Sequence, residues 1–374
     1  MGLLPARIKD ERIPLSYGIL GQETNGAGAI FKALRTIPVI QGIIEDMREL
    51  CPDAWLINFT NPSGMVAEAA IRNFGWERTI GICNLAIGSE NNEAKLLGVQ
   101  RDDLVFQFAG LNHFIWHRVF DSDGNELTEQ LIERINDPVD GAPAKLQASE
   151  ALPLDLLRAS KLLASSYHEY YFSAEQMVEH ELEAYAANAT RAERVHAIED
   201  ELFALYADPD LDHKPPQLAL RGGANYSDSA CGTIEAIHTN AGVRMTVAAR
   251  NRGAMIDLPD DCVVEVTSIV SAVGAEPLVW GAMPPHERGW LQLMKAMEEC
   301  TIAAAIDGDY GALLQAFHLN PLIPNGPRLR PLLHEMLVAN ERYLPRFADV
   351  IAQLKADGVT VTDETVRRIM AEEG

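Results

Sequence analysis

The chain has few cysteines and few basic residues, and two common targeting features do not occur in it. Its five cysteines are an odd number without a Cys-x-x-Cys spacing, so no disulfide framework is implied and a reduced, cytoplasmic compartment is expected. The N-terminus has neither the charged segment nor the apolar run of a secretory signal. No stretch approaches the roughly 20 apolar residues of a membrane span, so we expect no membrane partner.

The charge balance is strongly acidic. The chain carries 31 Lys and Arg residues against 54 Asp and Glu residues, a formal net charge of −23. Such a field repels nucleic acid and anionic membranes, so any anionic ligand must be met by local Arg or Lys side chains. With 374 residues, 47% of them hydrophobic, the chain can bury a large core in two domains.

The first part of the chain has the pattern of an α/β fold. Apolar spacing predicts helices, and short apolar runs that end in turn residues predict strands buried on both faces. Helix and strand alternate at short intervals, which indicates βαβ units and a parallel sheet. The predicted elements are the helix Gly28–Leu50, the strand Ala54–Thr60, the helix Pro62–Asn73, the strand Thr79–Cys83 and the helix Glu90–Leu97.

After Asp103 the pattern changes to α+β. The predicted elements are the strands Leu104–Ala109 and Phe114–Phe120, a helical region from about Ala144 to Leu205 that includes the charged helix Arg191–Tyr206, a β-rich stretch with Met245–Ala249 and Val263–Val273, and helices from Glu287 onward. We therefore predict an α/β protein with an incomplete Rossmann-like parallel sheet in residues 1–108 and an α+β catalytic domain in residues 109–374.

Polar residues follow the two strands predicted in the first part of the chain. Asn58 and Asn61 end the first strand, at the edge where open α/β sheets bind ligands, and their amides can bind sugar hydroxyls. Turn formation before Pro62 is the more common role of such residues. Cys83 ends the next strand, and with His113 it can hold a borderline divalent metal. By spacing alone, a buried apolar cysteine and a core histidine are more common.

Tyrosines and arginines are the other candidates for chemistry. Tyr167, Tyr170 and Tyr171 form a cluster that usually serves packing, but a tyrosinate can act as a general base where nearby cations stabilise its charge. The guanidinium fork of arginine matches phosphate geometry, although most arginines are solvated or paired with Glu. The arginines that stand out against the acidic background are Arg7, Arg35, Arg191 and Arg221.

Several short segments occur in an order that resembles family 4 of the glycoside hydrolases, most closely its 6-phospho-β-glucosidase branch. The resemblance runs from Arg7 to Phe347. The segments that carry it are Asp10-Glu-Arg-Ile-Pro-Leu15, Gly21-Gln-Glu-Thr24, Ala33-Leu-Arg-Thr36, Asn58-Phe-Thr-Asn-Pro-Ser-Gly64, Ile82-Cys-Asn84, Gly110-Leu-Asn-His113, Arg221-Gly-Gly-Ala-Asn-Tyr-Ser227, Leu258-Pro-Asp-Asp261 and Tyr343-Leu-Pro345. It implies a catalytic domain similar to the C-terminal half of lactate and malate dehydrogenases, and assembly as a homodimer or homotetramer.

The resemblance implies an oxidation and elimination mechanism on a phosphorylated disaccharide or β-glucoside, with NAD and a divalent metal, usually Mn²⁺, as cofactors. NAD takes hydride from C3 of the sugar, a base removes the C2 proton, and the C1–O bond then breaks. Cys83 and His113 match the metal ligands. Tyr167 matches the base, with Tyr170 as the open alternative, and Glu23 matches the carboxylate that strengthens that base.

Substrate contacts are implied in the same way. Arg7 and Asn61 match contacts of the family, with Arg7 as a phosphate partner, and Arg191 matches a second phosphosugar contact more weakly. Asn84 resembles the β-glycoside branch, since the α-glycoside branch tends to carry Asp beside the cysteine.

The chain departs from the family pattern at two places. Leu85-Ala86 replaces the usual Val-Pro after the Cys-Asn pair, and no Gly-x-Gly-x-x-Gly turn follows a strand. We therefore expect that the coding region extends upstream of Met1 and that this chain binds NAD weakly. The alternatives to a 6-phospho-β-glucosidase are an inactive remnant that binds phosphosugars and a relative that acts on α-glycosides or unphosphorylated sugars.

Overall fold

The structure, a computed structural model, describes residues 3–135, 152–221 and 225–373 and consists of two compact units. The first unit is built from Met1–Pro38, Ala174–Ala224 and Cys300–Gly374, and the second unit from Val39–Ser173 and Asn225–Glu299. Helices α2 (Gly26–Leu50) and α12 (Pro285–Asp307) contribute to both units. The division of the chain into residues 1–108 and 109–374 stays a prediction.

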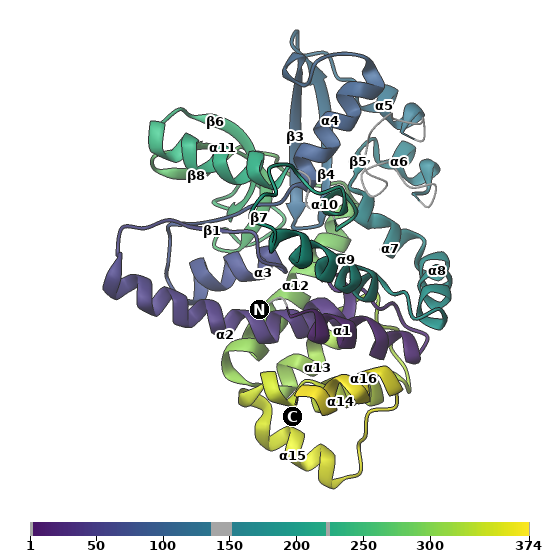
Figure 1. Cartoon of the computed structure of the whole chain (residues 1–374). Helices are drawn as coiled ribbons and strands as arrows, with labels where there is room; N and C mark the ends of the chain where they lie inside the picture. The colour runs from purple at the N-terminus through teal and green to yellow at the C-terminus, as the bar shows by residue number, and fades with distance from the viewer. Residues whose placement is uncertain (1–2, 136–151, 222–224, 374) are drawn as a thin grey trace. The chain divides into compact units, whose positions relative to one another are not determined.

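The second unit contains an eight-stranded mixed sheet (Figure 1). Its strands are β1 (Leu56–Asn58), β2 (Thr79–Gly81), β3 (Leu104–Leu111), β4 (Phe114–Asp121), β5 (Leu163–Ala164), β6 (Val243–Arg250), β7 (Val263–Ser271) and β8 (Gly274–Pro277). The order is β1-β2-β6-β7-β3-β4-β5, and β8 pairs with β7. Strands β1 and β2 are parallel, and the other pairs are antiparallel. The predicted α/β class is confirmed, with the parallel part limited to one pair of described strands.

Helices cover both faces of this sheet because its strands are apolar on both sides. On one face, Val247 and Ala249 of β6 form a cluster with Ala236 of helix α11 (Tyr226–Thr239). On the other face, Ala248 packs against Ala67 of α3 (Ser63–Glu68), which continues as a π-helix at Ala69–Asn73. Successive residues of β6 thus enter opposite cores, as the alternation of side chains along a strand requires.

One element corrects the helical region predicted at Ala144–Leu205. Residues 144–151 lie outside the described residues, and the rest contains the helices α6 (Leu154–Ser160), α7 (Glu169–Phe172), α8 (Ala174–Ala186) and α9 (Arg191–Tyr206). Leu163 and Ala164, however, form β5 and pair with His117 and Trp116 of β4. The physical reason is the outer edge of β4, whose backbone groups need a partner and obtain one from this short extended segment.

The first unit is helical in its described residues. Besides α8 and α9 it contains α1 (Leu4–Ser16), α10 (Gln217–Arg221), α13 (Tyr310–Leu319), α14 (Leu329–Ala339), α15 (Ala348–Ala356) and α16 (Glu364–Glu373).

A buried ion pair ties α1 to the segment before α16. Both Oδ atoms of Asp363 accept from Nε of Arg12 at 3.1 Å, and Tyr185 donates to Oδ2 at 2.7 Å. Nη1 of Arg12 pairs with Oε1 of Glu193 at 2.9 Å.

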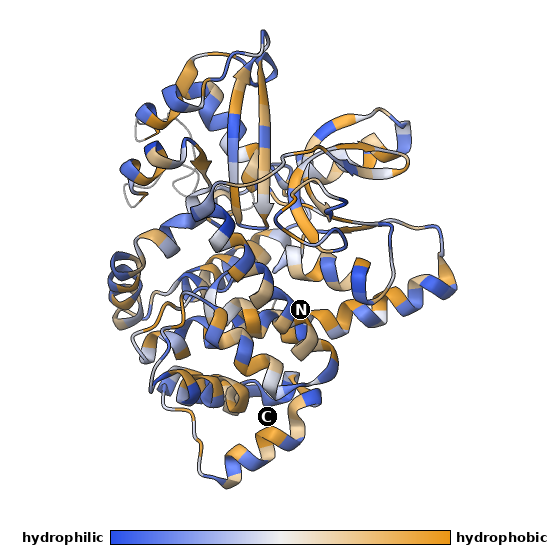
Figure 2. Ribbon diagram, turned by 180° about the vertical axis from the view of Figure 1, so that it is seen from behind, coloured by the Kyte–Doolittle hydropathy of each residue, from blue (hydrophilic) through white to orange (hydrophobic). Residues whose placement is uncertain are grey.

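Helix α2 mixes hydrophobic and hydrophilic residues along its length (Figure 2). By length and composition it is apolar enough to cross a membrane, which the sequence pattern did not predict. However, 67% of its apolar window is buried within the fold, as is typical of a core helix. Ile30, Phe31 and Ile37 belong to that buried part.

We expect Asp363→Asn to destabilise the chain by about 1.5–3 kcal/mol at neutral pH, because the buried Arg12 would lose one of its two carboxylate partners and keep only Glu193. Burial raises the pKa of Asp363, but the bonds from Arg12 and Tyr185 outweigh it and hold that pKa below its ordinary value. The stabilisation is therefore complete above the ordinary pKa of 3.8 and is lost as the pH falls through the lower folded value.

Urea unfolding as a function of pH measures this effect. The difference in unfolding free energy between the parent and Asp363→Asn should shrink below about pH 4. The exposed Asp349→Asn serves as the control and should cost less than about 1 kcal/mol. Equal losses for the two variants would contradict the buried role of Asp363.

Candidate metal and substrate site

The site in the second unit begins at the carboxyl end of β2. Cys83 lies two residues after that strand and two residues before the first residue of helix α4 (Leu85–Leu97), which starts earlier than the predicted Glu90. Burial raises the pKa of the Cys83 thiol to about 12 and Glu265 acts in the same direction, whereas the N–H of Leu85 and the side chain of Asn112 hydrogen-bond the sulfur and lower it. A bound divalent cation would reverse this balance, because a coordinating thiol is deprotonated.

His113 is placed by a tight hairpin. Strands β3 and β4 are joined by the two residues Asn112 and His113, and His113 has a left-handed backbone with φ +64°. Gly110 allows the backbone of β3 to come close to that of β4. Its φ is +153°, and an added Cβ would lie 2.3 Å from the carbonyl oxygen of Phe114. The Gly-Leu-Asn-His motif is thus a hairpin end in which glycine allows the close backbone contact.

The structure brings the two predicted metal ligands together. Sγ of Cys83 lies 3.5 Å from Nε2 of His113, and both side chains are buried. A sulfur at about 2.3 Å and a nitrogen at about 2.1 Å from one tetrahedral ion would be about 3.6 Å apart. The donor set therefore fits a borderline divalent cation, although a thiol–imidazole hydrogen bond has similar geometry.

Cys83 and His113 would form an open metal site, with only two protein ligands. Among the residues that the structure describes, no group of three or more His, Cys, Asp or Glu side chains is arranged to hold a metal ion. Cys83 and His113 are thus two protein donors that leave other coordination positions to water or substrate oxygens, as catalytic metal sites do. Oδ1 of Asn84 lies 3.9 Å from the Cys83 sulfur.

Tyr167 lies against His113. Its ring stacks on the imidazole with centroids 4.4 Å apart and an interplanar angle of 14°. The preceding Ser165 ties this segment to the hairpin, because its N–H donates to Ile115 at 3.1 Å and its hydroxyl donates to the carbonyl of His113 at 3.3 Å. Tyr170 lies further along, with its ring 6.0 Å from that of Tyr167. Of the two candidates for the base, Tyr167 is thus the one that stacks on the imidazole.

The loop after β1 joins the same region. Asn58 is buried, and its Oδ1 accepts from the N–H of Thr60 at 3.1 Å, so its turn-forming role is the one observed. Oδ1 of Asn61 accepts from the N–H of Ser63 at 3.4 Å. An added Cβ on Gly64 would lie 3.1 Å from Cβ of Asn112, which places this loop against the hairpin turn.

The second unit contains two groups of buried charge, one at Asn112 and one at Lys295. Its Nδ2 donates to Oε2 of Glu265 at 2.7 Å, and burial raises the pKa of Glu265 to about 7, against the effect of that hydrogen bond. Lys295 pairs with Glu298 at 2.7 Å and with Glu68 at 2.6 Å. Burial lowers the pKa of Lys295, but the two carboxylates outweigh it and raise the net value, so the ammonium keeps its charge. A cation bound beside Cys83 would offset part of the burial cost of Glu265.

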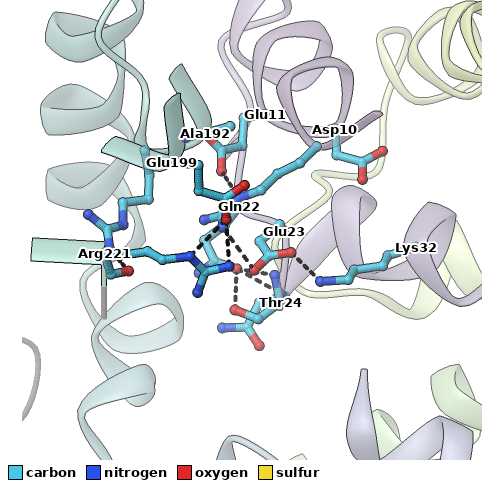
Figure 3. A network of polar contacts seen from close by, with 12 residues as sticks. Asp10, Glu11, Gln22, Glu23, Thr24, Lys32, Ala192, Glu199 and Arg221 are labelled. Atoms are coloured by element: carbon cyan, nitrogen blue, oxygen red, sulfur yellow. Dashed lines mark hydrogen bonds and ion pairs between the residues drawn. The ribbon is translucent and has the colours of Figure 1, made fainter. Parts of the chain in front are cut away.

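The other predicted residues lie in the first unit. Arg7 on α1 donates to Oε1 of Glu11 at 3.0 Å and pairs with Glu23 at 3.5 Å, while Glu23 also pairs with Lys32 (Figure 3). Oε2 of Glu11 accepts from the N–H of Ala192, the second residue of α9, at 2.7 Å. Burial raises the pKa of Glu11, and Arg7 and that N–H oppose it. Arg7 and the N-terminus of α9 are therefore linked through Glu11.

The guanidinium group of Arg191, the first residue of α9, faces the C-terminal end of helix α10. Its Nη2 donates to the carbonyl of Arg221 at 2.7 Å, and both Nη atoms lie 3.4 Å from the carbonyl of Leu220, at the end of α10. Arg221 itself pairs with Glu199 (Figure 3). An anion at Arg191 would have to compete with these carbonyl groups. Residues 222–224 of the Arg-Gly-Gly motif lie outside the described residues.

Sequence reasoning missed three residues of the site. Asn112 belongs to the Gly-Leu-Asn-His motif but no role was predicted for it, and Ser165 gave no signal at all. Glu265 could have been found, since it is a single carboxylate within the run Val263–Ser271 of otherwise apolar, Ser and Thr residues. A charge in the middle of a buried strand is uncommon unless it has a partner.

Comparisons with known proteins give the family. Residues 1–99 match the model of the family 4 glycosyl hydrolases, and residues 108–323 match the model of the family 4 glycosyl hydrolase C-terminal domain. A probable 6-phospho-β-glucosidase of Bacillus subtilis is 46% identical over 351 residues, which cover 94% of this chain and 79% of the relative. A 6-phospho-β-glucosidase of Escherichia coli is 40% identical over 95% of this chain and 80% of the relative.

A solved structure is similar over the same length. The 6-phospho-β-glucosidase of Thermotoga maritima, determined with manganese, NAD⁺ and glucose-6-phosphate, superposes with a TM-score of 0.80 at 30% identity. The superposition covers 91% of this chain and 79% of that one.

The hairpin geometry predicts the effect of Gly110→Ala. An added methyl group would meet the Phe114 carbonyl, and we expect a loss of about 3 kcal/mol or more. Gly124 is the matched control, because its φ is +85° but an added Cβ would have nothing within 4 Å in the part of the chain that the structure describes. Gly124→Ala should therefore cost only about 1–2 kcal/mol. Urea unfolding compares the two, and equal losses would contradict the steric account.

Proposed function

Because the chain belongs to family 4 of the glycosyl hydrolases, we propose that it hydrolyses 6-phospho-β-glucosides with NAD and a divalent metal ion as cofactors. The names and ligands of the relatives described above support this substrate and these cofactors. The observation that carries the proposal is the pair of Cys83 and His113, whose sulfur and nitrogen atoms are 3.5 Å apart. Buried thiol and imidazole groups in contact, with a tyrosine stacked on the imidazole, suit metal-assisted proton abstraction.

Cys83 and His113 are the proposed protein ligands of the metal. When bound, NAD accepts the hydride from C3 of the sugar and the cation polarises the C2 and C3 oxygens. The surrounding backbone positions these two side chains. The hairpin turn positions His113, the N-terminus of α4 follows Cys83, and both side chains are buried.

Tyr167 is the proposed base that removes the proton at C2. Its attachment through Ser165 to the hairpin holds the ring at a fixed place relative to His113. A base stacked on a metal ligand would be in place to take the C2 proton of a sugar bound at that metal, as general base catalysis requires. The role of strengthening this base is proposed for Glu23 on the resemblance alone.

Substrate contacts are proposed as the resemblance implies them. Asn61 and Asn84 follow the two parallel strands and would bind hydroxyl groups through their amides. Arg7 and Arg191 would meet the 6-phosphate, since the guanidinium fork matches phosphate oxygens. Glu11 links the helices that carry these two arginines.

No residue of this chain is assigned to NAD. The described residues contain no glycine-rich turn between a strand and a helix, which is the usual pyrophosphate site of such sheets. The NAD requirement therefore rests on the relatives. Assembly as a homodimer or homotetramer and a cytoplasmic location remain part of the proposal.

Release of p-nitrophenol from its 6-phospho-β-glucoside tests the proposed activity. We expect turnover with NAD and Mn²⁺, and a loss of at least about 100-fold after chelation, because the cation carries the Lewis-acid chemistry. Cys83→Ser should lose activity to the same extent, whereas the exposed Cys231→Ser should keep it. Unphosphorylated glucosides and 6-phospho-α-glucosides are the substrate controls.

Three outcomes would contradict the proposal. Turnover without NAD would contradict the oxidation step, and faster cleavage of the α-glucoside would favour the other branch of the family. No turnover of any substrate, with NAD and Mn²⁺ present, would favour a phosphosugar-binding protein without catalysis.

The two tyrosines can be separated by substitution. Tyr167→Phe should lower kcat by about 10²–10⁴-fold, because it removes a positioned general base. Tyr170→Phe is the matched control and should stay within about 10-fold. Incorporation of deuterium at C2 of the product in heavy water, followed by NMR, reports proton abstraction directly. A larger loss for Tyr170→Phe would assign the base to Tyr170 instead.

A further inference from the structure

His168 directly follows the proposed base and is fully buried. It ends the short 3-10 turn Ser166–His168, and its ring stacks on Phe114 with centroids 4.4 Å apart and an interplanar angle of 20°. Tyr167 stacks on His113 in the same way, with centroids 4.4 Å apart. Two consecutive side chains of this turn thus contact two consecutive residues of the hairpin.

Packing alone does not require a histidine at position 168. The neighbours of its ring are aromatic, with Trp116 edge-on at 4.5 Å and Phe172 at 5.2 Å besides Phe114, so any aromatic ring would suit them. Nε2 is buried and has no hydrogen-bond partner among the residues that the structure describes. A buried polar atom without a partner is unfavourable. The reason for a histidine must therefore lie at the other ring nitrogen, Nδ1.

Nδ1 of His168 faces two oxygen atoms of Ser165. It lies 3.1 Å from the carbonyl oxygen and 3.1 Å from Oγ. A carbonyl oxygen only accepts, so Nδ1 carries a proton. Burial lowers the pKa of His168 to about 3, against the effect of the hydrogen bond with the Ser165 backbone, so the ring is neutral and this proton is its only one.

The hydroxyl of Ser165 continues the chain of hydrogen bonds to the hairpin. Because its Oγ accepts from His168, its single hydrogen is left for the carbonyl of His113, which lies 3.3 Å away. The N–H of Ser165 donates to the carbonyl of Ile115 at 3.1 Å. Ser165 is thus bonded to the hairpin at two points, and Tyr167 follows it by two residues.

We propose that His168 is a positioning residue for the base: its Nδ1–H group directs the Ser165 hydroxyl at the hairpin and so holds Tyr167 on His113. This inference rests on the proposed function, in which Tyr167 removes the C2 proton. Reacting groups must be held to within about 0.5 Å by side chains that packing and hydrogen bonds fix in turn. His168 meets both conditions, since its ring is packed and its N–H is bonded.

Two substitutions separate the hydrogen bond from the packing. His168→Phe keeps an aromatic ring and removes the donor, and Ser165 can still donate to His113. We expect its kcat on p-nitrophenyl 6-phospho-β-glucoside to fall about 10–100-fold, because the base is no longer held in place. Its KM, its Mn²⁺ affinity by EPR of the free ion and its midpoint of urea unfolding should stay close to those of the parent.

His168→Asn is the opposite variant, because its amide N–H replaces the Nδ1–H donor while most of the ring is lost. We expect its kcat to stay within about 3-fold of the parent and its unfolding midpoint to fall, because a cavity replaces the ring. The exposed His180→Phe is the control and should match the parent in both measurements. A kcat of His168→Phe equal to that of the parent, or a slower His168→Asn than His168→Phe, would overturn the inference.

A double variant tests the route through Ser165. Ser165→Ala removes the hydroxyl and should lower kcat. Ser165→Ala with His168→Phe should be no slower than Ser165→Ala alone, because both substitutions act through the same hydroxyl. Losses that multiply would show that His168 acts on its own, and would contradict this route.

NMR of the ¹⁵N-labelled full chain gives a readout that does not depend on turnover. The ring signals of His168 are identified by their absence from the spectrum of His168→Asn. Nδ1 should have the chemical shift of a protonated nitrogen, and Nε2 that of an unprotonated one. The reverse assignment would overturn the inference, because the Ser165 hydroxyl would then donate to the ring and not to His113.

The outcomes also distinguish this inference from the proposed function. If the parent turns over with NAD and Mn²⁺ and His168→Phe has the same kcat, the positioning role is wrong and the proposed function stands. If the parent neither turns over nor incorporates deuterium at C2, both are wrong.

Discussion

The contact between Cys83 and His113 is the interaction on which the account of this protein depends. It joins two segments that are 30 residues apart in the sequence. One is the end of a parallel strand that leads into α4, and the other is a two-residue turn between β3 and β4. The turn requires a glycine at position 110 and a left-handed residue at His113. Such local backbone constraints at a site are typical of geometry that function maintains.

Buried charged side chains have different kinds of partner in the two units. In the first unit, Arg12 and Asp363 form a buried ion pair that ties distant segments together. In the second unit, the buried Lys295 pairs with Glu68 and Glu298, whereas the buried Glu265 accepts a hydrogen bond from the neutral amide of Asn112. A cation bound beside Cys83 would lower the burial cost of Glu265.

Much of the fold was predictable from the sequence, because apolar patterns act locally. The strands β3, β4, β6 and β7 and the helix α9 lie close to their predicted ranges. The order of the sheet was not predictable, since β6 and β7 insert between β2 and β3 through contacts that are distant in sequence. The strand β5 was missed because two residues are too short to show a period.

The site was predictable only in part, and for a different reason. Spacing alone favoured structural roles for Cys83 and His113, and the family resemblance was needed to pair them. That resemblance gave no role to Asn112 or Glu265, because a hydrogen bond between residues that are 153 positions apart leaves no local pattern in the sequence. A carboxylate in an apolar strand predicts a buried partner, but it does not identify that partner.

X-ray absorption spectroscopy of the Mn²⁺-loaded protein tests the central claim most directly, because it counts the atoms around the metal. If Cys83 and His113 hold one ion, the spectrum should contain one sulfur neighbour together with the outer-shell scattering of an imidazole ring. A coordination shell made only of oxygen atoms, with neither sulfur nor imidazole, would contradict the account.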